Sequence, residues 1–208
     1  MSPFPFADVP AHDLIVFHDT AVATGGWSTQ SPRHESGPWA AIEANHRFNH
    51  LLWDEEDLAR RRDVPDATIV ANKRAIDRYN QLRNDAIERI DETLLARLSH
   101  VEPTADAWHN SETAGAIIDR LSILALKIHH MGLAAARPDA EAALRDACAQ
   151  KHARLEVQRA DLARCLDTLL ERAAQGRAFW RIYRQFKMYN DEQLNPYLRR
   201  ANTAKPPD

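Results

Sequence analysis

Residues 46–91 have the sequence HRFNHLLWDEEDLARRRDVPDATIVANKRAIDRYNQLRNDAIERID, and this stretch decides the fold. Apolar side chains recur in it at helical spacing on both sides of the turn DVPDA at residues 63–67. The spacing predicts two amphipathic helices, over about residues 38–62 and 67–98, that pack against each other as an antiparallel hairpin. Each helix also has a polar stripe rich in Asn, His and Asp. These short side chains suit a polar seam or a pocket better than a solvated face.

Two further long helices follow the hairpin. Ser111 or Thr113 is a suitable N-cap for a helix that reaches about Met131. Its segment IIDRLSILALKI is apolar nearly all round, which predicts a buried, central position. Asp139 is a suitable N-cap for a long helix that ends at Gly176. The expected fold class is therefore all-α, an up-down antiparallel bundle of four long helices plus a short C-terminal helix.

The two ends of the chain depart from this pattern. The first 37 residues contain four of the eleven Pro and the pair Gly25–Gly26, so we expect an irregular N-terminal arm there. An aromatic segment predicts the short C-terminal helix over about residues 177–189. The expected organisation is one bundle domain over residues 38–200, preceded by the arm at 1–37 and followed by a disordered tail at 201–208.

Composition bears on the function classes that remain. A net charge of −3 provides no basic field for nucleic acid, and no apolar run reaches the roughly 20 residues that span a bilayer. Cys148 and Cys165 lie about five helical turns apart on one predicted helix, so they cannot form a disulfide with each other. Unpaired thiols and the lack of a signal-peptide pattern indicate a cytoplasmic protein. The chain has no Gly-rich phosphate loop, and we predict no cofactor.

Helix geometry brings the two polar stripes of the hairpin face to face. The turn is centred near Val64–Pro65, and each helix rises about 1.5 Å per residue. Polar residues at equal distances from the turn should therefore lie opposite each other, and we call this series of pairs the polar ladder. The expected neighbours are Glu56 and Asp57 with Lys73, Trp53 with Asp77, Asn49 with Asn80, His46 with Asn84, and Glu43 with Glu88.

Three charged residues interrupt apolar stripes. Arg83 and Arg159 fall on the apolar sides of their helices, and Asp119 on the buried central helix must be paired or protonated. One interpretation is a structural ion-pair network. The other is a pair of guanidinium forks that grip a phosphate or a carboxylate.

Two metal-dependent classes match short patterns in the chain. A nucleotide pyrophosphohydrolase would use the acidic pairs at Asp57 and Glu88, but these lie about 22 Å apart along the hairpin axis, too far to share one Mg²⁺. A carboxylate-bridged di-iron site would use Glu43-x-x-His46, but it needs two such motifs and the chain has one. No metal ligands are assigned.

Four blocks of the sequence resemble the signature of an uncharacterised bacterial family, domain of unknown function 4254. They are NHRFNHLLWDEEDLARR, NKRAIDRYNQLRNDAIERID, NSETAGAIIDRLSILALKIHHM and QFKMYNDEQLNP, in this order. The resemblance covers about residues 40–200 and implies an all-α fold. It also implies a setting beside genes for glycosyltransferases and other enzymes of cell-envelope glycans. It assigns no catalytic residue.

The leading hypothesis is a seam that binds an anionic small molecule, a phosphorylated sugar or a nucleotide-sugar, with acid–base chemistry on it. His46 would carry the proton, because an imidazole pKa near about 6.5 suits exchange at neutral pH. The catalytic candidates are His46, Glu56, Asp57, Asp77 and Glu88. The substrate-binding candidates are Asn49, Trp53, Arg60, Lys73, Asn80, Arg83, Asn84, Asp119 and Arg159.

Two alternatives stay open. One is a non-catalytic scaffold whose polar ladder is closed internally and whose partner is a glycosyltransferase or a second copy of the chain. The other is a pyrophosphohydrolase-like enzyme that a dimer would complete. A concave patch with accessible His46, Trp53 and Asp77 favours a binding site, whereas a closed ladder without a cavity favours the scaffold.

Overall fold

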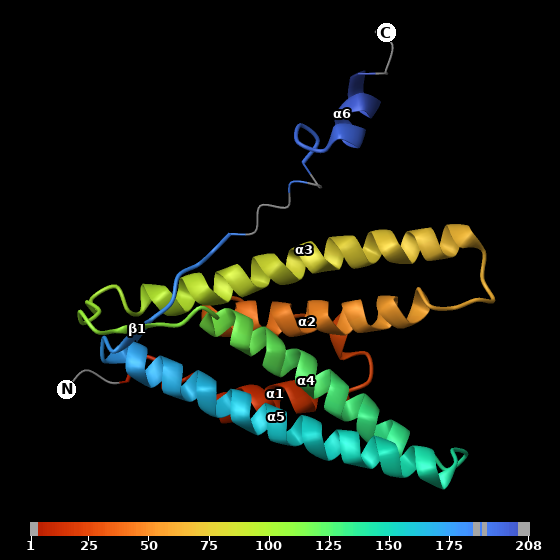
Figure 1. The fold of residues 1–208 in the computed structure, drawn as a ribbon, viewed down its shortest axis with the longest axis horizontal. Helices are drawn as coiled ribbons and strands as arrows, with labels where there is room; N and C mark the ends of the chain where they lie inside the picture. The colour runs from red at the N-terminus through yellow and green to blue at the C-terminus, as the bar shows by residue number, and fades with distance from the viewer. Residues whose placement is uncertain (1–3, 185–187, 189–190, 204–208) are drawn as a thin grey trace.

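The structure is a computed structural model that describes residues 4–184, 188 and 191–203. In this part of the chain the fold is all-α apart from one pair of two-residue strands, and helices pack on helices, as predicted (Figure 1). The elements are α1 (Ala11–Ala23), the 3₁₀ turn η1 (Trp27–Thr29), α2 (Gly37–Leu58), α3 (Asp66–Ala96), β1 (Trp108–His109), α4 (Ala114–Ala135), α5 (Ala142–Ala174), β2 (Ala178–Phe179) and α6 (Pro196–Thr203).

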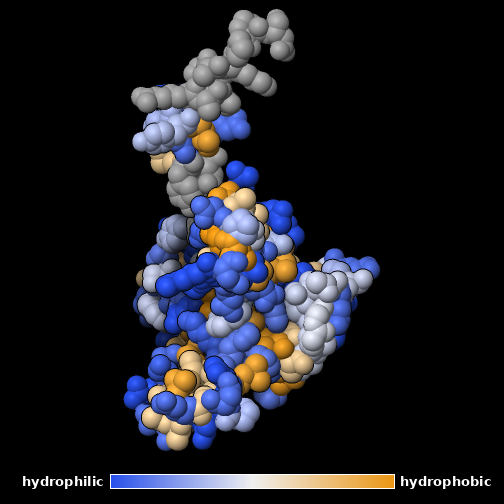
Figure 2. All heavy atoms as spheres, turned by 90° about the vertical axis from the view of Figure 1, so that its right-hand side faces the viewer, coloured by the Kyte–Doolittle hydropathy of each residue, from blue (hydrophilic) through white to orange (hydrophobic). Residues whose placement is uncertain are grey.

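Two helical hairpins, α2–α3 and α4–α5, form the body of the molecule. Helix α4 lies at the centre and packs against α1, α2, α3 and α5. The two hairpins diverge towards their connecting turns (Figure 1), and a view of that end shows the turns as separate lobes (Figure 2). Among the described helices, none is long and apolar enough to cross a membrane.

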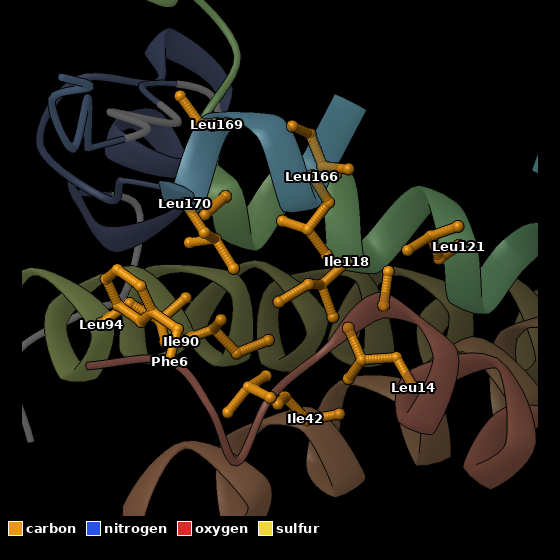
Figure 3. Close-up of a cluster of buried hydrophobic side chains, with 14 of the residues drawn as sticks. Phe6, Leu14, Ile42, Ile90, Leu94, Ile118, Leu121, Leu166, Leu169 and Leu170 are labelled. Carbon is orange, nitrogen blue, oxygen red and sulfur yellow. The ribbon is translucent and has the colours of Figure 1, made fainter. Parts of the chain in front are cut away.

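The hydrophobic core lies where the hairpins converge. Apolar side chains of α2, α3, α4 and α5 meet there, joined by Phe6, Val9, Ala11 and Leu14 of the N-terminal segment. Figure 3 shows most of the largest of these side chains. The largest fully buried members of the core include Phe6, Leu14, Ile42, Ile90, Leu94, Ile118, Leu121, Leu166, Leu169 and Leu170. The apolar circumference of α4 therefore has the buried, central position that its sequence predicts.

Helix ends follow the chemistry of capping at two of the three predicted positions. The Thr113 side chain accepts a hydrogen bond from the Ala116 backbone N–H at 3.1 Å, which caps α4. Gly176 follows α5 with φ of 70°, the left-handed conformation that Gly adopts without strain. The prediction for Asp139 was wrong, because α5 begins at Ala142 after Glu141, and Asp139 instead pairs with Arg137 at 2.9 Å.

The N-terminal segment is not the irregular arm that its Pro and Gly content predicted. Residues 11–23 form α1, whose buried face includes Leu14, His18 and Ala21. The Ala11 backbone N–H, at the start of this helix, donates to Asp167 Oδ1 of α5 at 3.0 Å. The prolines lie outside the helix, and its apolar residues complete the core.

The predicted helix over residues 177–189 was also wrong in its described part. Residues 178–179 instead form β2, parallel to β1, and the backbone N–H groups of Trp108 and Asn110 donate to the carbonyls of Arg177 and Phe179. Trp180 is buried. Residues 185–187 and 189–190 lie outside the described part, as do 204–208 of the predicted disordered tail, whereas residues 196–203 are helical.

The Asp167 cap can be tested by the Asp167→Ala variant. We expect a loss of about 1 kcal/mol in the free energy of unfolding, the usual cost of removing a side-chain cap, measured by urea denaturation. Asp146→Ala is the control, since Asp146 is an exposed carboxylate of the same helix. Equal effects of the two substitutions would show that the bond to Ala11 does not hold α1 in place.

Candidate functional site

The inner part of the polar seam is a closed hydrogen-bond network between α2 and α4. Asn45 Nδ2 and Asn49 Nδ2 donate to Asp119 Oδ1 at 2.8 and 2.9 Å. Asn49 Nδ2 also lies 2.9 Å from Ser122 Oγ, and His46 Nδ1 lies 2.7 Å from the same oxygen. All five residues are buried. Asp119 Oδ1 thus accepts two amide hydrogen bonds, and it also forms a long ion pair with Arg83 Nε at 4.0 Å. The structural interpretation predicted the ion pair with Arg83, whereas the amide partners were not predicted.

His46 belongs to a buried aromatic cluster behind this network. Its ring centroid lies 4.5 Å from that of His18, 5.5 Å from that of His50 and 5.1 Å from that of Trp27. His46 Nε2, His50 Nε2 and both ring nitrogens of His18 have no hydrogen-bond partner among the described residues.

These surroundings keep the buried imidazoles neutral. Burial, with a smaller contribution from Arg159, lowers the pKa of His18 to about 3. Burial and the neighbouring imidazoles of His18 and His50 lower the pKa of His46 well below its usual value. His46 is fully buried and does not line the seam cleft described next, so the expectation that it is accessible was wrong.

The outer part of the seam is an open cleft between α2, α3 and α4, with a volume of about 320 Å³. Its floor is apolar, formed by Leu52, Ile123 and Leu126. Its polar lining consists of seven residues, all of them predicted from the sequence: Asn49, Trp53, Glu56, Asp57, Arg60, Asn80 and Arg83. We call this cavity the seam cleft.

Arg83 is the cation of the seam cleft whose hydrogen-bonding capacity remains unused. Its Nε lies 4.0 Å from Asp119 Oδ1, beyond hydrogen-bond distance, and has no other partner in the described part of the chain. Asp119 Oδ1 is already occupied by two amides. Arg60, in the turn that follows α2, in contrast donates to Glu56 Oε2 at 2.8 Å, and this pair is open to solvent.

Trp53 forms one wall of the seam cleft. Its indole stacks on the His130 imidazole of α4, with ring centroids 4.5 Å apart and an interplanar angle of 7°. It also packs against Val22, Ala125 and Leu126, and its Nε1 is buried without a partner among the described residues. The contact with His130 joins residues far apart in the sequence, and no sequence pattern indicated it.

Besides the buried His46 and Asp119, five more predicted site residues lie outside the seam cleft. Lys73 and Asp77 are exposed on α3, because the side of α3 that faces α2 is one position away, where Asn72 donates to Glu55 at 2.7 Å. Arg159 pairs with Asp19 of α1 at 2.6 Å, a partner that only the unpredicted helix provides. Asn84 and Glu88 line a separate pocket near Tyr183.

The acidic residues do not gather into one carboxylate cluster. Asp57 lines the seam cleft, whereas Glu88 and Asp91 line the separate pocket, and burial raises the pKa of Asp91 to about 6. Glu43, of the single E-x-x-H motif, accepts hydrogen bonds from the backbone N–H groups of Arg33 and His34. The described residues contain no group of three or more His, Cys, Asp or Glu placed to hold a metal ion.

Comparison with protein-family models matches residues 39–182 to a protein of unknown function, DUF4254. The chain belongs to this family. Comparison with curated proteins and with solved structures found no significant match. All residues that line the seam cleft of this DUF4254 protein fall within the matched range, whereas α1, with His18, precedes it.

The buried imidazoles make stability sensitive to acid. His18 has a pKa of about 3 in the folded state and about 6.5 in the unfolded chain, so its contribution is present above pH 6.5 and is lost as the pH falls towards 3. Between pH 7 and pH 5 we expect it to remove about 2 kcal/mol from the free energy of unfolding.

Urea denaturation of the His18→Leu variant at pH 5 and pH 7 measures this contribution. The variant should lose less stability than the unmodified protein over this interval, and His12→Gln, at an exposed position of the same helix, should not differ from it. The raised pKa of Asp91 increases the free energy of unfolding as the pH falls, the opposite of the effect of His18. This contribution is the same in all three proteins, so it cancels when they are compared. Identical pH dependence in the His18→Leu variant would contradict a buried neutral imidazole.

Proposed function

We propose that the seam cleft binds an anionic small molecule, a phosphorylated sugar or the sugar phosphate part of a nucleotide-sugar. The observation that supports this best is Arg83, a partly exposed guanidinium at the cleft that makes no hydrogen bond within the described residues. A guanidinium presents several donors in a fixed plane, which match the oxygens of a phosphate or a carboxylate. An anion in the cleft would supply the acceptors that Asp119 does not.

The other residues of the seam cleft suit the hydroxyl groups of a sugar. Asn80 offers both a donor and an acceptor, Asp57 offers acceptors, and Trp53 offers an apolar ring surface. The volume of about 320 Å³ lies at the lower end of the usual range for small-molecule pockets, which suits one sugar ring with its phosphate. A full nucleotide-sugar would extend out of the cleft.

Acid–base chemistry on the bound molecule would use Asp57 rather than His46. Asp57 is exposed at the cleft and makes no hydrogen bond or ion pair with another described residue, whereas His46 is buried behind the amide network. Glu56 is engaged with Arg60. Our proposal places this activity in the bacterial cytoplasm and in the metabolism of cell-envelope glycans, a setting supported by the gene neighbourhood that the family resemblance implies.

The closed inner network favours a second candidate, a non-catalytic partner of a glycosyltransferase. Asn45, Asn49 and Asp119 satisfy one another inside the protein, as a purely structural seam requires. This candidate predicts that no sugar phosphate stabilises the protein, and that substitutions in the network lower stability alone.

Arg83→Gln tests the binding proposal. The ligands for calorimetric titration are glucose 1-phosphate, UDP-glucose, glucose and inorganic phosphate. We expect the unmodified protein to bind either glucose 1-phosphate or UDP-glucose more tightly than it binds glucose. The variant should bind it about tenfold or more weakly, because a hydrogen bond to a charged group contributes roughly 1.5–3 kcal/mol.

The matched control is Arg74→Gln, which removes the charge of an exposed arginine of the same helix outside the cleft. Its affinity should equal that of the unmodified protein. Equal affinities of the Arg83→Gln variant and the control, or a titration in which none of the four compounds binds, would refute the proposal.

A further inference from the structure

A second groove lies on the other side of Trp53 and was not indicated by the sequence. It runs between the C-terminal half of α4 and the facing part of α5, with Trp53 of α2 as its end wall, and has a volume of about 460 Å³. We call it the α4–α5 groove. Its α4 and α5 residues lie in the halves of these helices next to the turn that joins them.

The walls of the α4–α5 groove are apolar. Trp53, Met131 and Leu155 are partly buried and line it, together with Ala134. Few polar groups line it beside its charges, so a ligand rich in hydroxyl groups would lose hydrogen bonds to water without replacing them. An apolar ligand body would instead gain from the removal of both surfaces from water.

Three cations surround the groove: Lys127 from α4, and Lys151 and Arg154 from α5. Lys151 and Arg154 are three residues apart and therefore lie on the same face of α5. None of the three makes a hydrogen bond or an ion pair with any residue in the described part of the chain, and no carboxylate lines the groove. Their mutual repulsion is thus not offset by an acidic partner within the groove.

Other arginines of the same helix differ in this respect. Arg159 pairs with Asp19 at 2.6 Å, and Arg164 pairs with Asp161. An anionic group of a ligand would provide the missing charge.

We infer that the α4–α5 groove binds a small anionic amphiphile, with its phosphate or carboxylate head at Lys127, Lys151 and Arg154 and its apolar body along Trp53, Met131 and Leu155. The volume falls within the usual range for small-molecule pockets. This site goes beyond the seam cleft and does not depend on it, because the two cavities use different cations and share Trp53 alone.

Calorimetric titration with decyl phosphate, kept below its micelle concentration, tests the inference. Decanol and inorganic phosphate probe the two halves of the ligand separately, and each should bind about tenfold or more weakly than decyl phosphate. Dodecanoate tests whether a carboxylate replaces the phosphate. Vesicles that contain anionic lipid provide a further arm, since a cationic groove with apolar walls could also meet a membrane surface.

Two variants separate charge from shape. Lys151→Gln/Arg154→Gln should weaken decyl phosphate binding by about tenfold or more. The matched control, Arg74→Gln/Arg89→Gln, removes two exposed cations of α3 and should leave the affinity unchanged. Ala134→Phe fills the groove but keeps all its charges, so it should also abolish binding, with an unchanged circular dichroism spectrum as evidence of folding.

Three results would overturn the inference. The first is an equal loss of affinity in the groove variant and the control variant, which would indicate nonspecific charge attraction. The second is binding of inorganic phosphate as tight as that of decyl phosphate, which would show that the apolar walls play no part. The third is binding to vesicles but not to monomeric decyl phosphate or dodecanoate, which would indicate a membrane surface as the partner.

Discussion

The carboxylate of Asp119, buried on the central helix, is the constraint on which the polar seam depends. A charged group on α4 must find hydrogen bonds inside the protein, because isolation from water is costly. Asn45 and Asn49, one turn apart on α2, supply them at 2.8 and 2.9 Å. These two bonds determine which face of α2 meets α4. One turn further along the same face of α2, Trp53 therefore also contacts α4, at His130.

The same contact explains why two cavities adjoin Trp53. Trp53 is one turn beyond Asn49 on α2, and its indole stacks on His130 of α4 with ring centroids 4.5 Å apart. On one side remains the seam cleft, bounded by α3, and on the other the α4–α5 groove. The single residue that lines both cavities is thus Trp53.

The sequence predicted the long helices, the buried position of α4 and the seven polar residues of the seam cleft, because hydrophobic periodicity identifies stripes on helices. Periodicity does not determine how a stripe is rotated against a third helix, so the exposure of Lys73 and the burial of His46 could not be predicted. Arg159 pairs with Asp19 of α1, a helix that the Pro-rich N-terminal sequence did not predict. Lys151 and Arg154 resemble any solvated helical face until the neighbours of α5 are known.

The buried inner residues of the seam maintain the structure, whereas its partly exposed outer residues can bind a ligand. Asn45 is fully buried and Asp119 nearly so, and the amides of Asn45 and Asn49 donate to Asp119 Oδ1 inside the protein. Arg83 lies at the boundary, 27 % exposed, with its Nε 4.0 Å from Asp119 Oδ1. The carboxylate orients the guanidinium without occupying its donors, and solvent reaches its other side. An arginine in this position can exchange water for an anion without breaking a hydrogen bond of the fold, because the amides of Asn45 and Asn49 hold Asp119 Oδ1 independently of it.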